Sequence, residues 1–501
     1  MIVGNPIIMI LKAILNWFRL RRDYIANAVD KIPPEIKDVL VAWYSPCKQK
    51  LTNYDVIEAY VEDFTKWAYR NTRGVAKITN NTIVITNVVE TNNIIEDDNK
   101  PYSDLTIRVT GVTENKYLIV RQGRGKPEAR IKKDGVYTFK DNNLYFGFGV
   151  SVIGECNITI TQLPTSILKD FSGNKHDAYF YGFKGKLNSG VGIYKIDFSK
   201  TANANAFDNF ERFNNKIIAK GTYTGNYKVF GQYTINGIVK NKVTVKITGV
   251  FNLLDKLTLQ YGYITKDNKA VFKEMTIDND GVYSYDFNDI EIPDENNIAQ
   301  TIYNRFYFGG RVINDVNLIV EEIPDYPNQL CYDGKSYAVA YGLPILTDYT
   351  IIADRTWFAE KVNNGVFMSK LLEQNGAFIL EYKQGNKWNT YSYYSATNIN
   401  IDKDNSIVYQ TKNKYNEQTI YPGDKQDTDT LFIGTIKKND SRTFIGCHDN
   451  ILLFNRTLTD NELDLVKEHF FGIIRIKDAL LTVDGKPIIT TDNKYIKVNK
   501  K

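Results

Sequence analysis

Residues 447–472 read CHDNILLFNRTLTDNELDLVKEHFFG and predict a short strand, a capped helix and a helix stop. Residues 451–454 are the apolar run of the strand. Thr459 and Glu462 have the spacing of a capping box, in which each side chain satisfies a backbone N–H at the start of the helix. Gly472 follows the last apolar residue, where a helix end favours a left-handed backbone. A single helix after many strand-like runs is unusual.

The composition is that of several packed domains. The chain has 501 residues, so about two to four compact units are expected. A hydrophobic share of 43% with 34 tyrosines favours sheets over disorder, and a net charge of +5 with both signs interspersed is no nucleic-acid footprint. The cysteines lie far apart without metal-ligand spacing, which favours buried free thiols over a disulfide framework. They are Cys47, Cys156, Cys331 and Cys447.

Residues 1–37 predict a helical anchor or oligomerisation segment. Its polar residues fall at helical spacing and form one narrow stripe, so the rest of the helix must be covered by its own chain, by copies of itself or by a partner. The apolar run is shorter than the roughly 20 residues of a membrane span, and nothing basic precedes it as in a signal peptide. A membrane-surface role is the alternative. The proposed contact residues are Ile7, Ile10, Leu11, Ile14, Leu15, Trp17 and Phe18.

A four-part phrase occurs twice in the chain. Residues 104–112, 133–139, 144–150 and 156–164 match residues 242–250, 279–285, 306–312 and 316–324 in the same order. The period is too long for a solenoid, so each copy is predicted to be a complete β-sandwich. Asp134-Gly135 and Asp280-Gly281 predict hairpin turns in which Gly supplies a positive φ.

Other segments resemble laminin-G-like (concanavalin A-like lectin) jelly rolls. The resemblance rests on the closing segment with NRTLTDNEL, on VLVAWYS at 39–45, on a D-x-S-G-N turn within 167–183, and on residues 330–358. Because the repeats separate these blocks, it implies one discontinuous jelly roll into which two domains are inserted. Three domains in series is the simpler alternative.

The expected fold class is therefore mainly β: a laminin-G-like jelly roll with two duplicated β-sandwich domains inserted in it, plus an N-terminal helix. The sandwiches are assigned residues 70–164 and 213–325, and a C-terminal tail of two hairpins is assigned residues 473–501. The jelly roll is assigned residues 38–69, 165–212 and 326–472. Residues 203–213 are interpreted as a short polar helix or linker.

The sequence shows no catalytic constellation. The histidines, His176, His448 and His469, lack metal-ligand spacing, and the common nucleophile, phosphate-loop and zinc-protease motifs do not occur. Acidic residues lie in turn-like stretches, which favours solvated turns over the paired carboxylates of a glycosidase. These are Asp278, Asp280, Asp424, Asp427 and Asp429. Relatives of the jelly roll sometimes hold calcium, which stays an alternative without ligands. We predict no catalytic residue, no metal site and no cofactor.

One aromatic run suits carbohydrate. Trp388, Tyr391, Tyr393 and Tyr394 lie beside Asn389, and flat aromatic faces next to amides are typical of glycan binding. Period-two spacing predicts Tyr391 and Tyr393 on one face and Tyr394 on the other. One of the two faces is expected to be core, so a structural role is the alternative for about half of the run.

As a whole the chain resembles virion surface proteins of tailed phages, in particular crAss-like phages. The resemblance rests on the domain types, the apolar N-terminus, a composition rich in Asn, Lys, Ile and Tyr, and residues 39–65, VLVAWYSPCKQKLTNYDVIEAYVEDFT. It implies a non-enzymatic head fibre, capsid decoration or tail appendage in the virion. The implied partners are other virion proteins, copies of the chain, and host-surface or mucosal glycans, with no nucleic acid and no membrane span. The alternative is a secreted bacterial glycan-binding or polysaccharide-cleaving surface protein.

Overall fold

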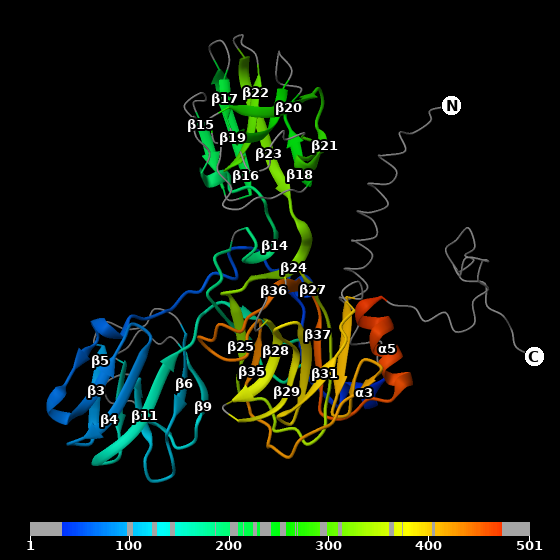
Figure 1. The fold of residues 1–501 in the computed structure, drawn as a ribbon. Coiled ribbons are helices and arrows are strands. Elements are labelled where there is room, and N and C mark those ends of the chain that lie inside the picture. Colours follow the sequence, from blue (N-terminus) through cyan, green and yellow to red (C-terminus); the bar gives the residue numbers. More distant parts are fainter. Residues whose placement is uncertain are drawn as a thin grey trace, which may run out of the picture.

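The computed structural model describes residues 33–97, 104–122, 128–140, 146–185, 187–200, 209–213, 215–223, 228–230, 242–250, 257–265, 267, 269–290, 298–308, 313–359, 365–372, 374–402 and 406–472. The predicted N-terminal helix, with Ile7 to Phe18, and the predicted C-terminal tail lie outside this part of the chain. The fold is mainly β, as predicted, and Figure 1 shows a central body with two outlying bodies of antiparallel strands. No helix of the described residues is long and apolar enough to cross a membrane.

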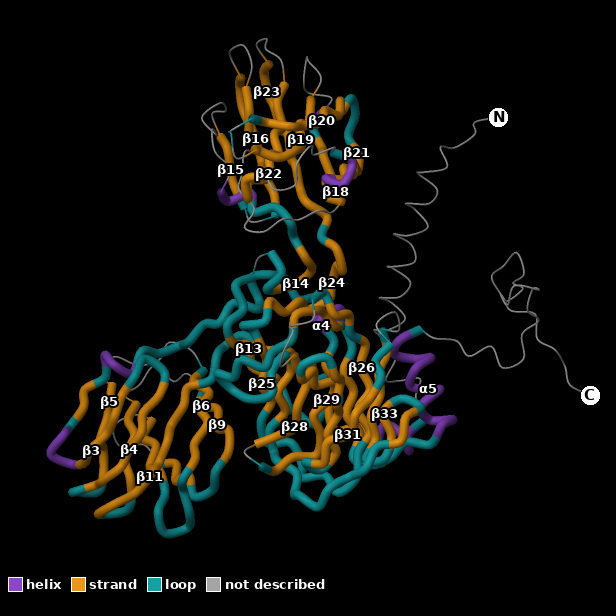
Figure 2. The backbone as a smooth tube through the Cα atoms, in the orientation of Figure 1, coloured by secondary structure: helices purple, strands orange, loops and turns teal. Residues whose placement is uncertain are grey.

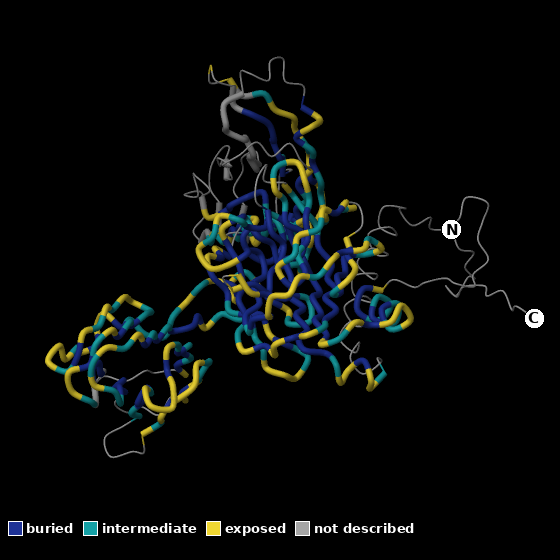
Figure 3. The backbone as a smooth tube through the Cα atoms, turned by 60° about the horizontal axis from the view of Figure 1, so that its bottom comes forward, coloured by how far each residue is buried: buried dark blue, intermediate teal, exposed yellow. Residues whose placement is uncertain are grey.

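Two sheets face each other in the central body. The order of the six-stranded sheet is β1 (Leu40–Tyr44), β37 (Ile451–Phe454), β26 (Thr350–Asp354), β32 (Ile407–Thr411), β33 (Lys414–Tyr415) and β34 (Gln418–Thr419). The order of the eight-stranded sheet is β12 (Ile167–Leu168), β13 (Ala178–Tyr181), β25 (Tyr337–Ala340), β35 (Leu431–Ile433), β28 (Gly365–Leu372), β29 (Asn375–Gln384), β30 (Lys387–Ser392) and β31 (Ser395–Ile399). Their facing side chains form one large hydrophobic core, and Figure 3 shows the buried residues gathered there.

Strand β1 pairs with β37 from the far end of the chain. Trp43 lies opposite Leu452, and Leu40 lies opposite Phe454. Side chains alternate across a strand, so Ala42 and Tyr44 enter the core between the sheets while Trp43 points to the other side. The sheet therefore joins the first strand of the central body to its last.

Helix α5 (Asp460–Phe471) covers the outer face of this six-stranded sheet. Its capping box between Thr459 and Glu462 and its left-handed stop at Gly472 are present as predicted. The ring of Phe470 meets Trp43 edge-on at 4.9 Å. Asn450 accepts a hydrogen bond from Trp43 Nε1 at 3.1 Å and donates to the carbonyl of Phe470 at 3.3 Å, which ties β1, β37 and α5 together.

A small sheet forms the neck toward the upper body in Figure 1. Its order is β14 (Gly190–Ile193), β24 (Asp325–Asp333), β36 (Ile445–His448) and β27 (Thr356–Trp357). Cys331 and Cys447 lie opposite each other on β24 and β36, and both are buried free thiols. Cys47 and Cys156 form no disulfide and are only partly buried. Short helices α3 (Pro34–Lys37) and α4 (Pro46–Gln49) flank β1, and Figure 2 separates these helices from the strands.

The first sandwich consists of two five-stranded sheets. One has the order β3 (Gly74–Ile78), β4 (Thr82–Val88), β11 (Gly154–Gln162), β6 (Leu105–Thr110) and β9 (Gly135–Phe139). The other has the order β2 (Ala68–Tyr69), β5 (Asn92–Asp97), β10 (Phe146–Val150), β7 (Leu118–Gln122) and β8 (Ala129–Ile131). The two sheets enclose a hydrophobic core of their own.

The second sandwich repeats this strand order. Its first sheet is β15 (Asn209–Arg212), β16 (Lys216–Tyr223), β23 (Ile313–Ile323), β18 (Lys242–Thr248) and β21 (Gly281–Asp286). Its second sheet is β17 (Lys228–Phe230), β22 (Ile298–Phe308), β19 (Leu257–Thr265) and β20 (Ala270–Ile277), without a counterpart of β2 among the described residues. The four matched phrases lie on equivalent strands, as a duplication requires.

Both sandwiches begin earlier in the chain than the sequence analysis placed them. Phe64 and Trp67 lie in the core of the first sandwich, and Ile196 and Phe198 lie in the core of the second. Residues 209–212, interpreted as helix or linker, are strand β15 of the second sandwich. The incoming segments carry few strand signals, so their packing partners could not be recognised from local pattern.

The predicted Asp-Gly hairpin turns are wrong. In each sandwich the Asp-Gly pair carries the chain from one sheet to the other, and neither Gly135 nor Gly281 has a positive φ. The aspartates instead accept from distant backbone N–H groups: Asp134 from Val112 at 3.0 Å, and Asp280 from Val250 at 2.8 Å. A long-range bond of this kind is invisible to turn statistics.

Candidate functional site

The aromatic run predicted to bind glycans is only partly exposed. Trp388 is half-buried on β30 and packs edge-on against Trp357 at 5.1 Å. Tyr393 is buried, and its hydroxyl donates to the carbonyl of Leu346 at 3.1 Å. Tyr394 keeps 39% of its surface exposed. Trp388 and Tyr393 therefore contribute packing, and the glycan-binding role of the run stays a prediction.

The predicted alternation of faces in this run is wrong. Tyr393 and Tyr394 have φ values of 43° and 66° and form the turn between β30 and β31. Because two consecutive left-handed residues reverse the chain, the period of two ends there. The ring of Tyr391 lies 6.4 Å from that of Tyr394, whereas Tyr393 packs against Tyr349 in the core. Tyr391 and Tyr394 thus share a face.

Two acidic residues that were interpreted as solvated turns have structural contacts. Asp427 is buried, accepts from the N–H groups of Leu346 at 2.8 Å and Ala377 at 3.0 Å, and forms an ion pair with Lys370. Burial is the main influence on Lys370, and it lowers the pKa of that ammonium. Asp280 is engaged by Val250, as described above.

A second buried ion pair lies in the jelly-roll core. Glu381 accepts two hydrogen bonds from Arg355, at 2.9 and 2.8 Å, and one each from Trp357 Nε1 at 2.8 Å and Tyr415 at 2.5 Å. The backbone of Glu381 is left-handed, with a φ of 56°, at an irregularity of β29. Both carboxylate oxygens are occupied by donors, so this glutamate is held as a structural anchor. Its partners are 24 to 34 residues away, and no local motif announces them.

The histidines are dispersed. His448 is fully buried, its Nε2 lies 2.8 Å from the hydroxyl of Tyr332, and burial lowers the pKa of its imidazole to about 3. It is therefore neutral at ordinary pH. Within the described ranges, no group of three or more His, Cys, Asp or Glu side chains could hold a metal ion.

A buried side chain at the end of each sandwich holds the segment that enters it. Gln162, at the end of β11, accepts from the N–H groups of Val61 and Glu62 at 2.9 Å each and donates to the carbonyl of Glu62 at 2.8 Å. We call this contact, and its counterpart in the second sandwich, the linker clamp. Gln162 has no exposed surface, so its amide makes these three hydrogen bonds in place of hydrogen bonds to water.

Glu322 makes the equivalent clamp at the end of β23. It accepts from the N–H of Lys195 at 2.7 Å and of Ile196 at 2.9 Å. Burial raises the pKa of Glu322 to about 8, although the two N–H groups and Lys195 oppose that shift. Each clamped segment continues into a short 3-10 turn, DFTK at 63–66 and DFSK at 197–200. The sequence analysis did not predict this match, although it is a fifth phrase that both copies of the repeat share.

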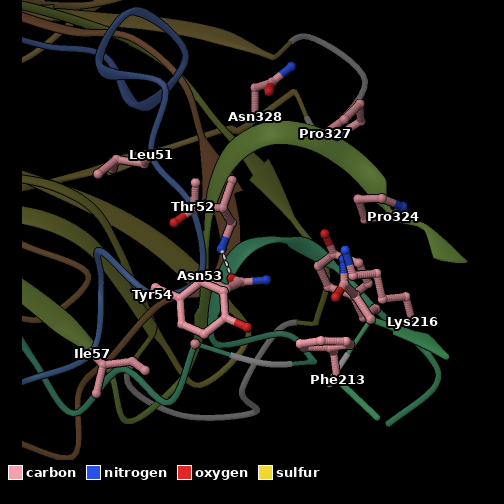
Figure 4. A pocket seen from close by; sticks show the side chains of 14 residues that line it. Leu51, Thr52, Asn53, Tyr54, Ile57, Phe213, Lys216, Pro324, Pro327 and Asn328 are labelled. Atoms are coloured by element: carbon pink, nitrogen blue, oxygen red, sulfur yellow. Dashed lines mark hydrogen bonds between the residues drawn. The ribbon is translucent and has the colours of Figure 1, made fainter. Parts of the chain in front are cut away.

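A pocket of about 500 Å³ lies where the second sandwich meets the jelly roll. We call it the junction pocket. Figure 4 shows Tyr54 and Ile57 on one side of it, and Phe213 and Lys216 on the other. It is lined by Leu51, Thr52, Asn53, Tyr54, Ile57, Gly185, Val191, Tyr194, Phe213, Asn215, Lys216, Pro324, Pro327 and Asn328. Sequence reasoning missed it because the lining comes from separate segments of two domains.

Comparisons with known proteins do not assign the chain to a family. No protein family and no curated protein matches it. Among solved structures, it is similar to Trypanosoma rangeli sialidase in complex with 2,3-difluoro-KDN, at 11% identity and a TM-score of 0.23, over 79% of this chain and 83% of that one. The same sialidase in complex with 2,3-difluorosialic acid gives 11% identity and a TM-score of 0.21 over the same shares. At these TM-scores the likeness carries no argument about fold or function.

Proposed function

We propose that the chain is a non-enzymatic structural protein of a tailed-phage virion, a head fibre, capsid decoration or tail appendage, that displays two β-sandwiches from a jelly-roll body. The proposal takes its virion assignment from the sequence resemblance. The observation that carries the display role is the duplicated linker clamp. Gln162 and Glu322 fix the incoming segment of each sandwich beside its outgoing strand.

Two adjacent linker segments would hold each sandwich in a defined orientation relative to the jelly roll. Each sandwich is attached through two adjacent segments of chain, and its strands extend away from the jelly roll in Figure 1. The first sandwich makes a further contact, in which the guanidinium of Arg108 lies 4.6 Å from the ring centre of Tyr341. A surface protein that carries binding or spacer domains needs such a defined orientation, because flexible attachment would cost ordering entropy on each contact.

The contacts of the acidic residues support the non-enzymatic part of the proposal. The carboxylates of Asp427 and Glu381, both in the jelly-roll core, are engaged in buried ion pairs and hydrogen bonds. A glycosidase needs two carboxyl groups facing a shared cleft. Incubating the purified chain with polysaccharides and measuring new reducing ends tests this part, and release of new ends would contradict it.

Particle composition tests the virion assignment. Phage particles purified from a culture that produces the chain are expected to contain it at a fixed copy number by mass spectrometry. Antibodies against the first sandwich are expected to decorate intact particles in electron microscopy. Secretion of the chain by uninfected bacteria, with none in particles, would instead favour the bacterial surface protein.

The proposed assembly element is the apolar helix of residues 1–37. Deleting residues 2–30 is expected to convert an oligomer into a monomer, measured by light scattering, because the apolar surface proposed to join the copies would be removed. An oligomer of unchanged mass would exclude this segment as the assembly element.

A further inference from the structure

The junction pocket has binding chemistry that a purely structural role does not use. We infer that it binds an oligosaccharide and prefers one that carries a carboxylate. The pocket volume of about 500 Å³ is within the usual range of roughly 300–1,000 Å³ for ligand sites. The inference extends the proposed display function, but its basis is the lining of the pocket alone.

Exposed apolar and aromatic side chains form part of the walls of the junction pocket. Tyr54 keeps 72% of its surface exposed and Ile57 keeps 41%, although both line a concave site. Phe213 and Tyr194 add two more rings to the same walls. Aromatic rings offer the flat apolar faces on which the C–H surfaces of sugars stack, while amphipathic Tyr tolerates the surrounding water.

Polar side chains also line the junction pocket. Asn53 Nδ2, Asn215 Oδ1 and the amide of Asn328, with the Thr52 hydroxyl as an acceptor, supply the neutral donors and acceptors that sugar hydroxyls need. Lys216 is the only charged residue among the fourteen that line the pocket, and no carboxylate is among them. Its Nζ lies 5.1 Å from the ring centre of Phe213, so the cation stands beside an aromatic wall. Glu321 lies opposite Lys216 on β23 but is not part of the lining, so the lining itself holds one cation and no acid, which favours an anionic ligand group.

Hydrogen bonds and close backbone contacts hold the walls of the junction pocket in place without a ligand. Asn53 Oδ1 accepts from the N–H of Val191 at 2.7 Å, and Thr52 donates its N–H and its hydroxyl to Asp55 at 2.7 Å each. A Cβ on Gly185 or Gly190 would lie 2.2 Å from an oxygen of Asn53, so both glycines are needed for this close approach. A preformed site loses little entropy when a ligand binds.

The location gives the site a second consequence. Asn215 is next to the linker clamp, because its carbonyl accepts from the N–H of Glu322 at 2.9 Å. One wall of the pocket belongs to the jelly roll and the other to the base of the second sandwich. A bound sugar would therefore bridge the two domains and hold the second sandwich in one orientation.

A glycan array with acidic and neutral saccharides, followed by calorimetry on the full chain, tests the inference. The matched calorimetric probes are trigalacturonic acid and galactotriose, which differ by carboxylate against hydroxymethyl. We expect acidic saccharides to bind on the array, and trigalacturonic acid to bind at least about tenfold more tightly than galactotriose. Absence of every saccharide from the bound set would overturn the inference.

Variants locate the binding. Tyr54→Ala and Phe213→Ala are expected to weaken binding of the best array ligand at least about tenfold. Lys216→Met is expected to abolish the preference for acid while leaving the neutral affinity within about twofold. Tyr421→Ala removes a tyrosine that is 69% exposed elsewhere and serves as the control. Binding that survives both aromatic substitutions, in variants that melt like the parent, places the sugar elsewhere and overturns the assignment.

The two proposals fail separately. Sugar binding is measured on the purified chain and does not depend on where that chain is found. The virion assignment is measured on particles, whether or not the pocket binds sugar.

Discussion

The two sandwiches share their strand order and their clamp geometry but differ in the chemistry of the clamp. The first uses the neutral Gln162, which both accepts and donates hydrogen bonds. The second uses Glu322, whose ionised carboxylate can accept hydrogen bonds but cannot donate one. The position is buried in both copies. The comparison teaches that the fold requires an acceptor for two N–H groups, while the charge of that acceptor is free to vary and makes only one of the two clamps sensitive to pH.

The largest effect is expected where both copies have the same steric constraint. Gly111 and Gly249 have φ values of +85° and +90°, and a Cβ there would lie 1.9 Å from the carbonyl oxygen of Asn157 and 1.8 Å from that of Asn317. Gly111→Ala and Gly249→Ala should each lower the free energy of unfolding of their own sandwich by about 3 kcal/mol or more. Hydrogen exchange followed by mass spectrometry resolves the affected domain.

Gly154→Ala is the control for this pair. Gly154 has a φ of +100° but no heavy atom within 4 Å of the added Cβ. Only the cost of a left-handed backbone remains, about 1–2 kcal/mol. Equal losses at Gly111 and Gly154 would show that the close approach to Asn157 is not the constraint.

The second effect separates the clamps by pH. Folding raises the pKa of Glu322 from 4.5 to about 8, so the folded chain binds a proton more readily than the unfolded chain between these values. The free energy of unfolding of the second sandwich is therefore highest below about pH 4.5 and falls, by up to about 1.4 kcal/mol per pH unit, until about pH 8. Glu322→Gln should remove this slope and stabilise the second sandwich at pH 8.

Exchange rates of residues 313–323 at pH 5.5 and 7.5, corrected for intrinsic exchange, measure this slope. Residues 154–162 of the first sandwich, held by Gln162, serve as the internal reference. A slope that persists in Glu322→Gln would assign the pH dependence to another group.

A third, smaller effect is expected at the paired aspartates. Asp134 and Asp280 each hold one backbone N–H, that of Val112 at 3.0 Å and that of Val250 at 2.8 Å. Asp134→Ala and Asp280→Ala should each cost their sandwich about 1–2 kcal/mol, because a partly buried N–H loses its acceptor. Denaturant unfolding monitored per domain checks this. If neither variant loses stability, water replaces the acceptor.

The smallest effect belongs to the paired tyrosines. Tyr137 and Tyr283 each donate from an exposed hydroxyl at 2.5 Å, to the carbonyls of Lys133 and Asn279. Tyr137→Phe and Tyr283→Phe should change the free energy of unfolding by about 0.5 kcal/mol or less, since water competes for both groups. A loss above about 1.5 kcal/mol in one copy only would reveal a contact that the repeat does not share.

Local signals explain what could be predicted from the sequence. The capping box of α5 spans three residues, and the four repeated phrases are strands whose alternating pattern is preserved in both copies. The mainly β fold class and the duplication follow from these. The beginnings of the sandwiches were misplaced because Phe64 and Phe198 pack against strands that follow much later.

The candidate sites were less predictable, because they depend on chain reversals and on contacts between domains. The turn at Tyr393 and Tyr394 required two left-handed residues, which no Gly or Asn announced. The junction pocket joins residues from 51–57, 185–194, 213–216 and 324–328. One usable signal was overlooked, the DFTK and DFSK pair, since aligning it would have extended both repeats to the clamped linkers.

The pairing of β1 with β37 has a consequence for how the chain is made. Trp43 and Asn450, which share a hydrogen bond, are 407 residues apart, so a ribosome must deliver almost the whole chain before β1 can complete its sheet. Each sandwich has its own core and can fold while synthesis continues. The apolar strand LVAWY stays without its partner strand β37 through that interval. During that interval residues 40–44 are an unpaired apolar strand, the kind of segment that chaperones protect from aggregation.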